Sequence, residues 1–413
     1  MPPSVFPTGV TLCDPKKTEK CFVVFDSADG KIHVINMAGE EVNLWPNKGM
    51  PGEIIDPDLV GGEKGHVFVG VRFDDPESSD ILRELDWDGN VVWEWGKKAP
   101  GGKAEQHHDQ ARLPNGNTLV NAYKTHVVSK ISDKPVRDNP IYEVTPDGDI
   151  VWEWLVSEHL DELGFPDETL AHLRANPTGF PLHQVLTQNN MSPLGPNKWF
   201  DAGDKRFHPD NIIIDARYGN YIAIIDRASG AIVWRMGPDY PAAHDMSKRS
   251  FTGPVPRPID MTAGQHDVHM IEKGLPGEGN ILIFDNQGAS GYPPFYLNHF
   301  AGSRVLEVDP LSKEIVWQYD TIQNGRPPWE FHSKHISSAR RLPKGNTLIN
   351  EGEQGRIFQV TPDGEIVWEY VSLHRDTAPS PRPERAGSRM IYRAQPVPYD
   401  WLPDITPKSE KAV

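Results

Sequence analysis

Thr361-Pro-Asp-Gly-Glu-Ile-Val-Trp-Glu-Tyr370 is one of six copies of a motif that recurs along the chain. Each copy joins a turn to a short run of β-branched and aromatic residues. Asp-Gly or Ser-Gly in the turn permits positive φ at a tight hairpin, and the Ile-Val-Trp run suits a half-buried strand. The other copies cover residues 37–45, 86–95, 145–154, 226–236 and 309–319. A strand-and-turn unit that returns about every 40 to 80 residues predicts a β-propeller.

Each repeat divides into four expected strands. In the last repeat these are 335–342, 345–350, 356–360 and 365–370, and the third and fifth repeats follow the same order. We therefore predict an all-β fold, a single six-bladed β-propeller over residues 1–413, whose first blade is completed by Arg389–Arg393. Three segments break the repeat: an inserted helix and loop segment at 156–206, with helices expected at 157–163 and 167–173, and two stretches rich in Pro, Gly and aromatic residues at 237–263 and 287–302. A closing strand and tail occupy 374–413.

Composition limits the possible partners. The 413 residues include 42 basic and 58 acidic side chains, a net charge of −16, which argues against a general nucleic-acid binder because neutralising phosphates needs a basic face. Cys13 and Cys21 make no disulfide framework. We see neither a secretory signal nor a membrane-spanning segment, and expect a cytoplasmic protein. The pattern leaves the oligomeric state open and favours a small-molecule ligand, aromatic or anionic.

Histidines open several of the expected inner strands. They are His107 or His108, His266 with His269, and His332 with His335. Because these positions are equivalent within the repeat, rotational repetition would bring them to one central channel. A shift of one residue reverses the face of a strand, so the sequence leaves open whether His107 or His108 faces the channel. Asp109 and Asp267 each follow a histidine, and we expect them to orient the ring or to bond the backbone.

Several motifs together resemble the bacterial arylsulfotransferase family. They are Gly264-Gln-His-Asp267, His107-His-Asp109, the stretch from Phe207 through Arg217, and residues 336–348, and the resemblance runs from about Thr8 to Trp401. That family is a six-bladed propeller that moves a sulfuryl group from one phenol to another through a sulfated histidine, without a nucleotide donor. The resemblance therefore implies a transferase that needs no cofactor.

The resemblance also assigns roles to single residues. It implies that His266 is the nucleophile, that His108 and Arg217 hold the sulfuryl oxygens, and that Asn189 matches a catalytic asparagine. Thr187 stands where the family has a histidine, and His183 or His208 could replace that ring. We expect His107, His269, His335 and Thr187 to contact substrate. A neutral imidazole is a competent nucleophile near neutral pH, and fixed cations would stabilise the developing charge.

A metal-dependent enzyme is the alternative reading of the same histidines. His108, His266, His269 and His335 could hold Cu, Fe, Zn or Mn for lyase, hydrolase or oxidase chemistry, because imidazole suits such ions. His266 and His269 are three residues apart, which on a regular strand places them on opposite faces and weakens the pair as ligands unless a bulge intervenes. A propeller that only binds partners fits the ordered histidines less well. A quinone-dependent dehydrogenase is also less favoured, because the repeated motif differs from the one typical of that class and no second acidic calcium site stands out.

Overall fold

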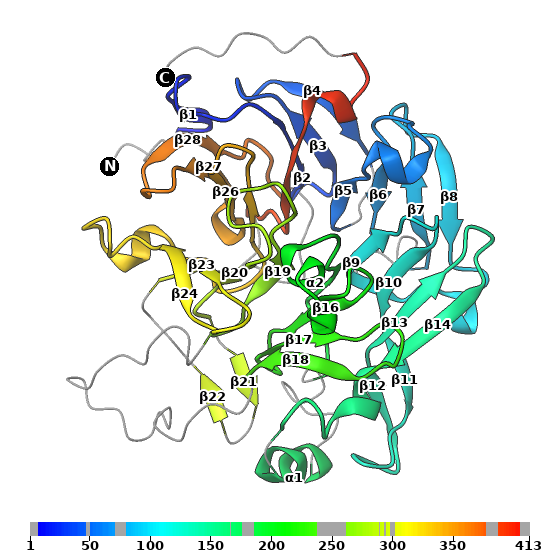
Figure 1. The fold of residues 1–413 in the computed structure, drawn as a ribbon. Coiled ribbons are helices and arrows are strands. Elements are labelled where there is room, and N and C mark those ends of the chain that lie inside the picture. The colour runs from blue at the N-terminus through cyan, green and yellow to red at the C-terminus, as the bar shows by residue number, and fades with distance from the viewer. Residues whose placement is uncertain are drawn as a thin grey trace. The chain divides into compact units, whose positions relative to one another are not determined.

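Strands dominate the computed structural model (Figure 1), which describes residues 7–46, 50–70, 80–165, 167–175, 186–237, 262–288, 290–292, 295–297, 302–376 and 387–404. Six antiparallel sheets of four strands, one of them extended by a fifth, form the blades of a six-bladed β-propeller. The chain divides into two compact units, Met1–Gly96 with Ile336–Val413 and Lys97–His335, and each supplies three blades. The all-β, six-bladed prediction is confirmed.

The first unit holds blades 1, 2 and 6. Blade 1 orders its strands β29 (Ala394–Val397), β2 (Phe22–Asp26), β3 (Ile32–Ile35) and β4 (Glu41–Trp45). Blade 2 orders them β5 (Gly52–Ile54), β6 (Val67–Val69), β7 (Leu82–Leu85) and β8 (Val91–Trp95). Blade 6 orders them β25 (Ser338–Arg341), β26 (Thr347–Glu351), β27 (Arg356–Val360), β28 (Ile366–Val371) and β1 (Gly9–Cys13). Short 3₁₀ turns are η1 (Pro57–Val60), η10 (Gly352–Gln354) and η12 (Tyr399–Trp401).

The second unit holds blades 3, 4 and 5. Blade 3 orders its strands β9 (Gln106–Arg112), β10 (Thr118–Ala122), β13 (Pro140–Val144) and β14 (Ile150–Leu155). Blade 4 orders them β15 (Asn190–Pro193), β16 (Ile212–Ala216), β17 (Tyr221–Ile225) and β18 (Ile232–Met236). Blade 5 orders them β19 (His266–Met270), β20 (Ile281–Asp285), β23 (Arg304–Val308) and β24 (Ile315–Tyr319).

Smaller elements join the blades of the second unit. Two hairpins pair β11 (Lys124–Val127) with β12 (Pro135–Asp138) and β21 (Ser290–Tyr292) with β22 (Phe295–Leu297). The helices and 3₁₀ turns are α1 (Asp167–Ala175), α2 (Lys198–Asp201), η2 (Pro100–Gly102), η3 (Val156–His159), η5 (Lys205–Phe207) and η9 (Pro328–Glu330). The helix expected at 167–173 is therefore α1, whereas the one expected at 157–163 is only the turn η3. None of the described helices is long and apolar enough to cross a lipid bilayer.

The six motif copies supply the fourth strand of every blade, namely β4, β8, β14, β18, β24 and β28. In four copies a buried tryptophan joins its blade to the next. Its indole Nε1–H donates to a carbonyl oxygen in the turn that precedes the next blade's fourth strand, as Trp45 does to Asp86 (2.9 Å), Trp154 to Gly230 (2.8 Å), Trp234 to Pro310 (2.8 Å) and Trp368 to Met37 (2.8 Å). The motif thus encodes both a strand and a contact between blades.

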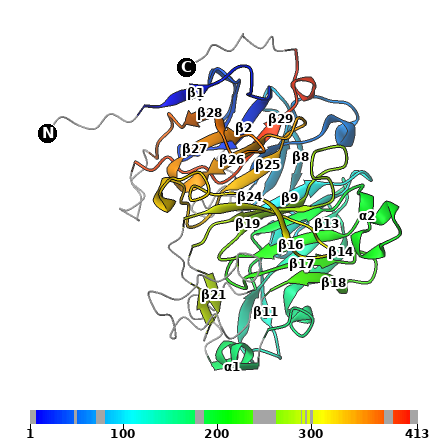
Figure 2. The same ribbon diagram turned by 60° about the vertical axis from the view of Figure 1, so that its left-hand side comes forward.

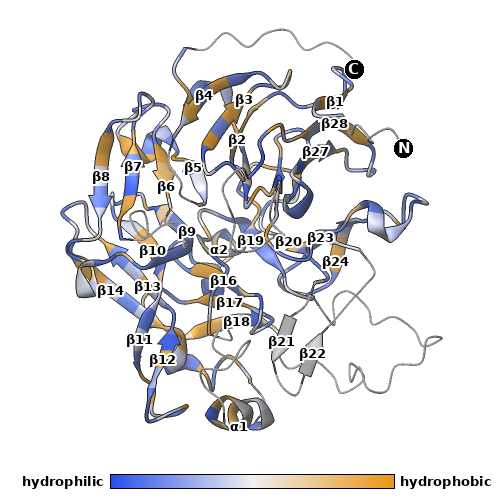
Figure 3. Cartoon of the chain, turned by 180° about the vertical axis from the view of Figure 1, so that it is seen from behind, coloured by the Kyte–Doolittle hydropathy of each residue, from blue (hydrophilic) through white to orange (hydrophobic). Residues whose placement is uncertain are grey.

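Apolar residues fill the spaces between neighbouring blades of each unit. One cluster, which includes Leu119, Trp154 and Ile214, lies between blades 3 and 4, and another, with Ile222, Val268 and Ile283, lies between blades 4 and 5. The hydropathy colouring in Figure 3 shows orange along much of β16 and β17, whose five residues each are all buried. Strands buried on both faces explain the apolar runs that lack alternation.

The two ends of the chain complete blades in the first unit (Figure 2). β1 pairs with β28, and β29 pairs with β2. The strand that completes blade 1 is therefore Ala394–Val397, which corrects the expectation of Arg389–Arg393. The reason is a carboxylate: Asp26 accepts hydrogen bonds from the backbone N–H groups of Tyr392 (3.0 Å) and Arg393 (3.2 Å), so ladder pairing begins one residue later.

Candidate functional site

The first strands of blades 3 and 5 begin with irregular backbone. His108 has φ of 60° and Asp267 has φ of 54°, values that are uncommon for residues other than glycine. In blade 5, His266 pairs with Phe284 and His269 with Leu282, so Asp267 and Val268 on β19 lie opposite the single residue Ile283 on β20. This is a β-bulge, and such bulges re-aim side chains next to active sites. Because Phe284 and Leu282 share a face, the bulge brings His266 and His269 to one face as well, which regular spacing did not predict.

His266 is held in one tautomer. Its Nδ1 lies 2.9 Å from the carbonyl oxygen of Gly264 and 2.8 Å from Oδ1 of Asn286. Asn286 has its amide fixed, because its Nδ2 donates to the carbonyl oxygen of Ser333 (2.7 Å). Both partners of Nδ1 are acceptors, so Nδ1 carries the proton and Nε2 carries the lone pair. The ring is 3% exposed.

The charge state of His266 follows from its surroundings. Burial lowers its pKa well below the usual value of 6.5, the positive charge of Arg217 lowers it further, and His108 and His335 add to the effect, while the bond to Asn286 opposes it. His266 is therefore neutral at neutral pH, the form in which imidazole is a nucleophile. The same interactions show that Arg217, His108 and His335 lie within electrostatic range of the ring.

Arg217 is positioned through its main chain. Its backbone N–H donates to Oδ1 of Asn189 (2.9 Å), and Asn189 in turn donates its own N–H to the carbonyl oxygen of Asp215 (2.8 Å). The guanidinium lies 4.9 Å from the centre of the Tyr218 ring and 3.4 Å from the carbonyl oxygen of Lys334. Asn189 therefore uses its amide oxygen to fix the turn that presents Arg217.

The structure distinguishes His107 from His108. His107 is fully buried, its ring stacked on Tyr123 with centroids 3.7 Å apart, whereas His108 is half-buried. The two Nδ1 atoms are 2.7 Å apart, and burial together with His108 lowers the pKa of His107 well below its usual value. His108 is the one that acts electrostatically on His266. His107 therefore packs on Tyr123, whereas His108 lies within electrostatic range of His266.

Thr187, in the place of the family histidine, hydrogen bonds with the side chain of Tyr123. The Arg137 guanidinium lies 4.6 Å from the centre of the same ring. Burial raises the pKa of the Tyr123 hydroxyl, so this phenol stays protonated. A phenol, a hydroxyl and a guanidinium therefore gather where a single imidazole was expected.

Sequence reasoning missed Tyr123 and Asn286. Both follow directly on the second strand of a blade, β10 and β20, and Arg217 follows β16 in the same way. Since adjacent strands are antiparallel, the end of a second strand lies beside the start of the first strand. Equivalent positions in the repeat come together at the centre, and this rule selects the histidines at the starts of the first strands. Applied to the ends of the second strands, the same rule selects Tyr123, Asn286 and Arg217.

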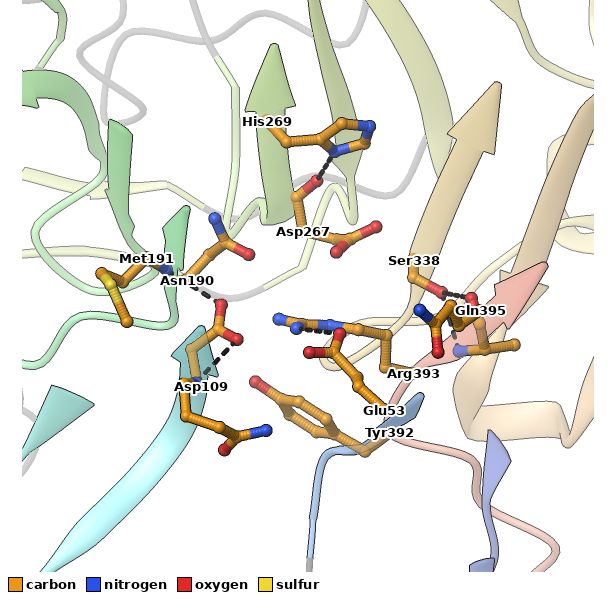
Figure 4. Close-up of polar contacts among 12 residues, drawn as sticks. Glu53, Asp109, Asn190, Met191, Asp267, His269, Ser338, Tyr392, Arg393 and Gln395 are labelled. Carbon is orange, nitrogen blue, oxygen red and sulfur yellow. Dashed lines mark hydrogen bonds and ion pairs between the residues drawn. The ribbon is translucent and has the colours of Figure 1, made fainter. Parts of the chain in front are cut away.

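The carboxylate of Asp109 bonds the backbone. Asp109 accepts from the backbone N–H of Gln110 (3.1 Å) and, across to blade 4, from that of Met191 (2.9 Å), as Figure 4 shows. Figure 4 also shows His269 turned back on its own strand, where its Nδ1 lies 2.9 Å from the carbonyl oxygen of Asp267. In the first unit, the same view shows the ion pair of Arg393 with Glu53 (2.7 Å).

Of the remaining histidines, His335 and His332 are half-buried, and His335 contributes to the electrostatics of His266. His208 is half-buried, and its Nδ1 accepts from the backbone N–H of Asp210 (3.2 Å). His183 lies outside the described residues.

Comparison with known proteins gives one family. The sequence model of the family described as Arylsulfotransferase (ASST) matches residues 59–375. No curated protein matches the chain. Among solved structures, a protein of unknown function from Bacteroides caccae is 13% identical over 92% of this chain and 99% of its own, with a TM-score of 0.48. Virginiamycin B lyase from Staphylococcus aureus is 14% identical over 90% and 85%, with a TM-score of 0.40. Neither likeness bears on the chemistry of the site.

Proposed function

Because this chain belongs to the arylsulfotransferase family, we propose that it moves a sulfuryl group from one phenol to another through His266. The observation that carries the proposal is the fixed tautomer of this buried, neutral ring. Its Nδ1–H is held by Gly264 and Asn286, which directs the lone pair to Nε2. An imidazole held in this way can attack without first losing a proton.

The proposed reaction has two half-reactions. In the first, Nε2 of His266 attacks the sulfur of an aryl sulfate, the N–S bond forms, and the S–O bond to the donor breaks. The electron pair of that bond leaves with the donor oxygen as a phenoxide, which takes up a proton. In the second, the oxygen of an acceptor phenol attacks the sulfur, the N–S bond breaks, and the acceptor loses its proton. Atoms, charge and protons balance, and no nucleotide or oxidant is consumed.

Positive charge beside His266 supports the transfer. Charge grows on the leaving and equatorial oxygens of the sulfuryl group, so a preorganised cation stabilises the transition state more than the ground state. Arg217 is the permanent cation, and Asn189 fixes its backbone. His108 and His335 are further donors within electrostatic range. Loss of one such donor typically costs about 2.7 to 4 kcal/mol of activation free energy.

The direct test is a trapped intermediate. Protein mixed with an aryl sulfate and no acceptor should gain the mass of one SO₃ group on the peptide that contains His266, and a phenol added later should remove it. His266→Gln should abolish both the adduct and turnover, whereas His208→Gln, which alters a half-buried histidine outside the site, should leave both intact. Turnover in His266→Gln, or an adduct on another residue, would refute the assignment.

Metal ligation by His108, His266, His269 and His335 stays a prediction, as does a cytoplasmic location. Among the described residues, these histidines do not offer three ligand atoms within 4.8 Å of one another. The geometry therefore adds nothing in favour of the metal-dependent alternative.

A further inference from the structure

A second group of histidines lies in the first unit. Asp29 belongs to the turn between β2 and β3, His33 to β3, and His374 to the segment that follows β28. One ligand atom of each lies within 4.8 Å of the others. The His33 Nε2 atom is 3.2 Å from Asp29 Oδ1, and the His374 Nδ1 atom is 3.7 Å from Asp29 Oδ2. Asp29 and His33, four residues apart, thus lie with the distant His374 so that one ligand atom of each is close to those of the other two.

A fourth residue sets the tautomer of His33. Glu41, at the start of β4, places Oε2 2.7 Å from His33 Nδ1, so the carboxylate takes the Nδ1–H. In the neutral ring this leaves the lone pair of Nε2 facing Asp29 Oδ1, a contact between two acceptors. A cation between them, either a proton or a metal ion, removes the repulsion. A carboxylate that orients a histidine from behind is the usual partner of a metal-binding imidazole.

The spacings suit a divalent ion. Ligand atoms ~2.0 to 2.2 Å from a tetrahedral ion lie roughly 3.3 to 3.6 Å apart, close to the 3.2 and 3.7 Å found here.

We propose that Asp29, His33 and His374 bind one divalent transition-metal ion, with Glu41 orienting His33. Imidazole and carboxylate ligands together suit Zn²⁺ and its neighbours in the first row. The ion would tie the segment after blade 6 to the turn between β2 and β3 of blade 1. His33 and His374 are stacked with centroids 3.6 Å apart and planes at 24°, so ligation would splay the rings until both nitrogens point at the ion. The site is separate from His266, so its failure would leave the proposed transferase function unaffected.

The test uses the full-length chain without an affinity tag, stripped with a chelator and titrated with Zn²⁺ by equilibrium dialysis. We expect the wild type to bind one equivalent of Zn²⁺ per chain and His374→Ala to bind none. His374 is half-buried and lies outside the blade strands, so its replacement should leave the strands intact. Glu41→Gln should weaken binding about 10- to 100-fold, the usual effect of changing a residue that orients a ligand. His208→Ala changes a half-buried histidine beside a single carboxylate, Asp210 at 3.8 Å, and should bind Zn²⁺ like the wild type.

Co²⁺ offers an independent readout, because a tetrahedral site gives strong visible absorption bands that disappear in His374→Ala. Thermal unfolding should shift upward with Zn²⁺ in the wild type and not in that variant, because an ion that binds only the folded state stabilises it. Three results would overturn the proposal: no saturable Zn²⁺ binding, an unchanged equivalent in His374→Ala, or an equivalent that depends on His266 instead.

Discussion

Asn286→Leu tests whether the hydrogen bond that fixes the His266 tautomer contributes to catalysis as well as to the stability of the fold. The substitution keeps the approximate shape of a fully buried side chain and removes the 2.8 Å contact with Nδ1. In the ground state this is a bond between neutral groups, worth about 0.5 to 1.5 kcal/mol. In the transition state the ring gains positive charge as the N–S bond forms, so the same bond becomes charge-assisted and is worth about 1.5 to 3 kcal/mol.

The difference between the two states decides the rate. The variant loses about 1 to 1.5 kcal/mol more stabilisation in the transition state than in the ground state. Because each 1.36 kcal/mol of barrier changes a rate about tenfold, kcat should fall roughly 5- to 12-fold. KM should change little. The pKa of His266 should fall further, because Asn286 raises it in the wild type.

Release of phenol from an aryl sulfate, followed at saturating donor and acceptor, measures kcat. The matched control is Asn211→Leu, because Asn211 is equally buried and makes two hydrogen bonds, to the backbone N–H of Arg227 (3.0 Å) and the carbonyl oxygen of Arg206 (2.9 Å), away from His266. It should lower stability and leave kcat unchanged. Equal slowing in both variants, or an unchanged kcat in Asn286→Leu, would refute the reasoning.

Three further outcomes are expected. Arg217→Ala should raise the barrier to turnover by about 2.7 to 4 kcal/mol, the range for one preorganised donor, whereas the exposed Arg206→Ala should not; an unchanged rate in Arg217→Ala would make that residue structural. Burial raises the pKa of Asp26 to about 6 from 3.8, so its contribution to stability is present at low pH and is lost as the pH rises through about 6. Between pH 4 and pH 7, the free energy of unfolding of Asp26→Asn should therefore rise by up to about 3 kcal/mol relative to that of the wild type, because a shift of 2.2 pKa units corresponds to about 1.36 kcal/mol per unit. Urea unfolding at several pH values measures this difference. A difference that does not change with pH would contradict the assignment of a buried carboxyl. Trp154→Phe removes the 2.8 Å bond to Gly230 and should cost about 1 kcal/mol in the same assay, and no loss would mean that the indole N–H is dispensable.

The sequence predicts the blades well because each motif copy carries its own turn and its own strand. The expected segment 356–360 matches β27 residue for residue, and 365–370 differs from β28 by one residue at each end. The strand that completes blade 1 is harder to place, since nothing local shows that Asp26 would bind the backbone of residues 392 and 393. Strand ends are set by such distant side chains, which a short pattern does not contain.

The site is predicted in part for a similar reason. Rotational repetition brings His266, His108 and His335 together, because it depends only on equivalent positions. The choice between His107 and His108 depends on positive φ at a residue that is not glycine, which no sequence pattern signals. The shared face of His266 and His269 depends on the bulge at Asp267 in the same way.

The indole bonds between blades mean that a turn serves its neighbour as well as its own hairpin. Each of the four donors lies on one fourth strand, and its acceptor lies in the turn of the following blade. A duplicated blade would therefore already carry the indole donor and the carbonyl acceptor that bond neighbouring blades. It could pack beside them without new residues at the contact. Conversely, an insertion in the turn at Gly230 would remove the hydrogen bond from Trp154 and so destabilise the preceding blade. A change in one repeat would therefore lower the stability of the repeat before it.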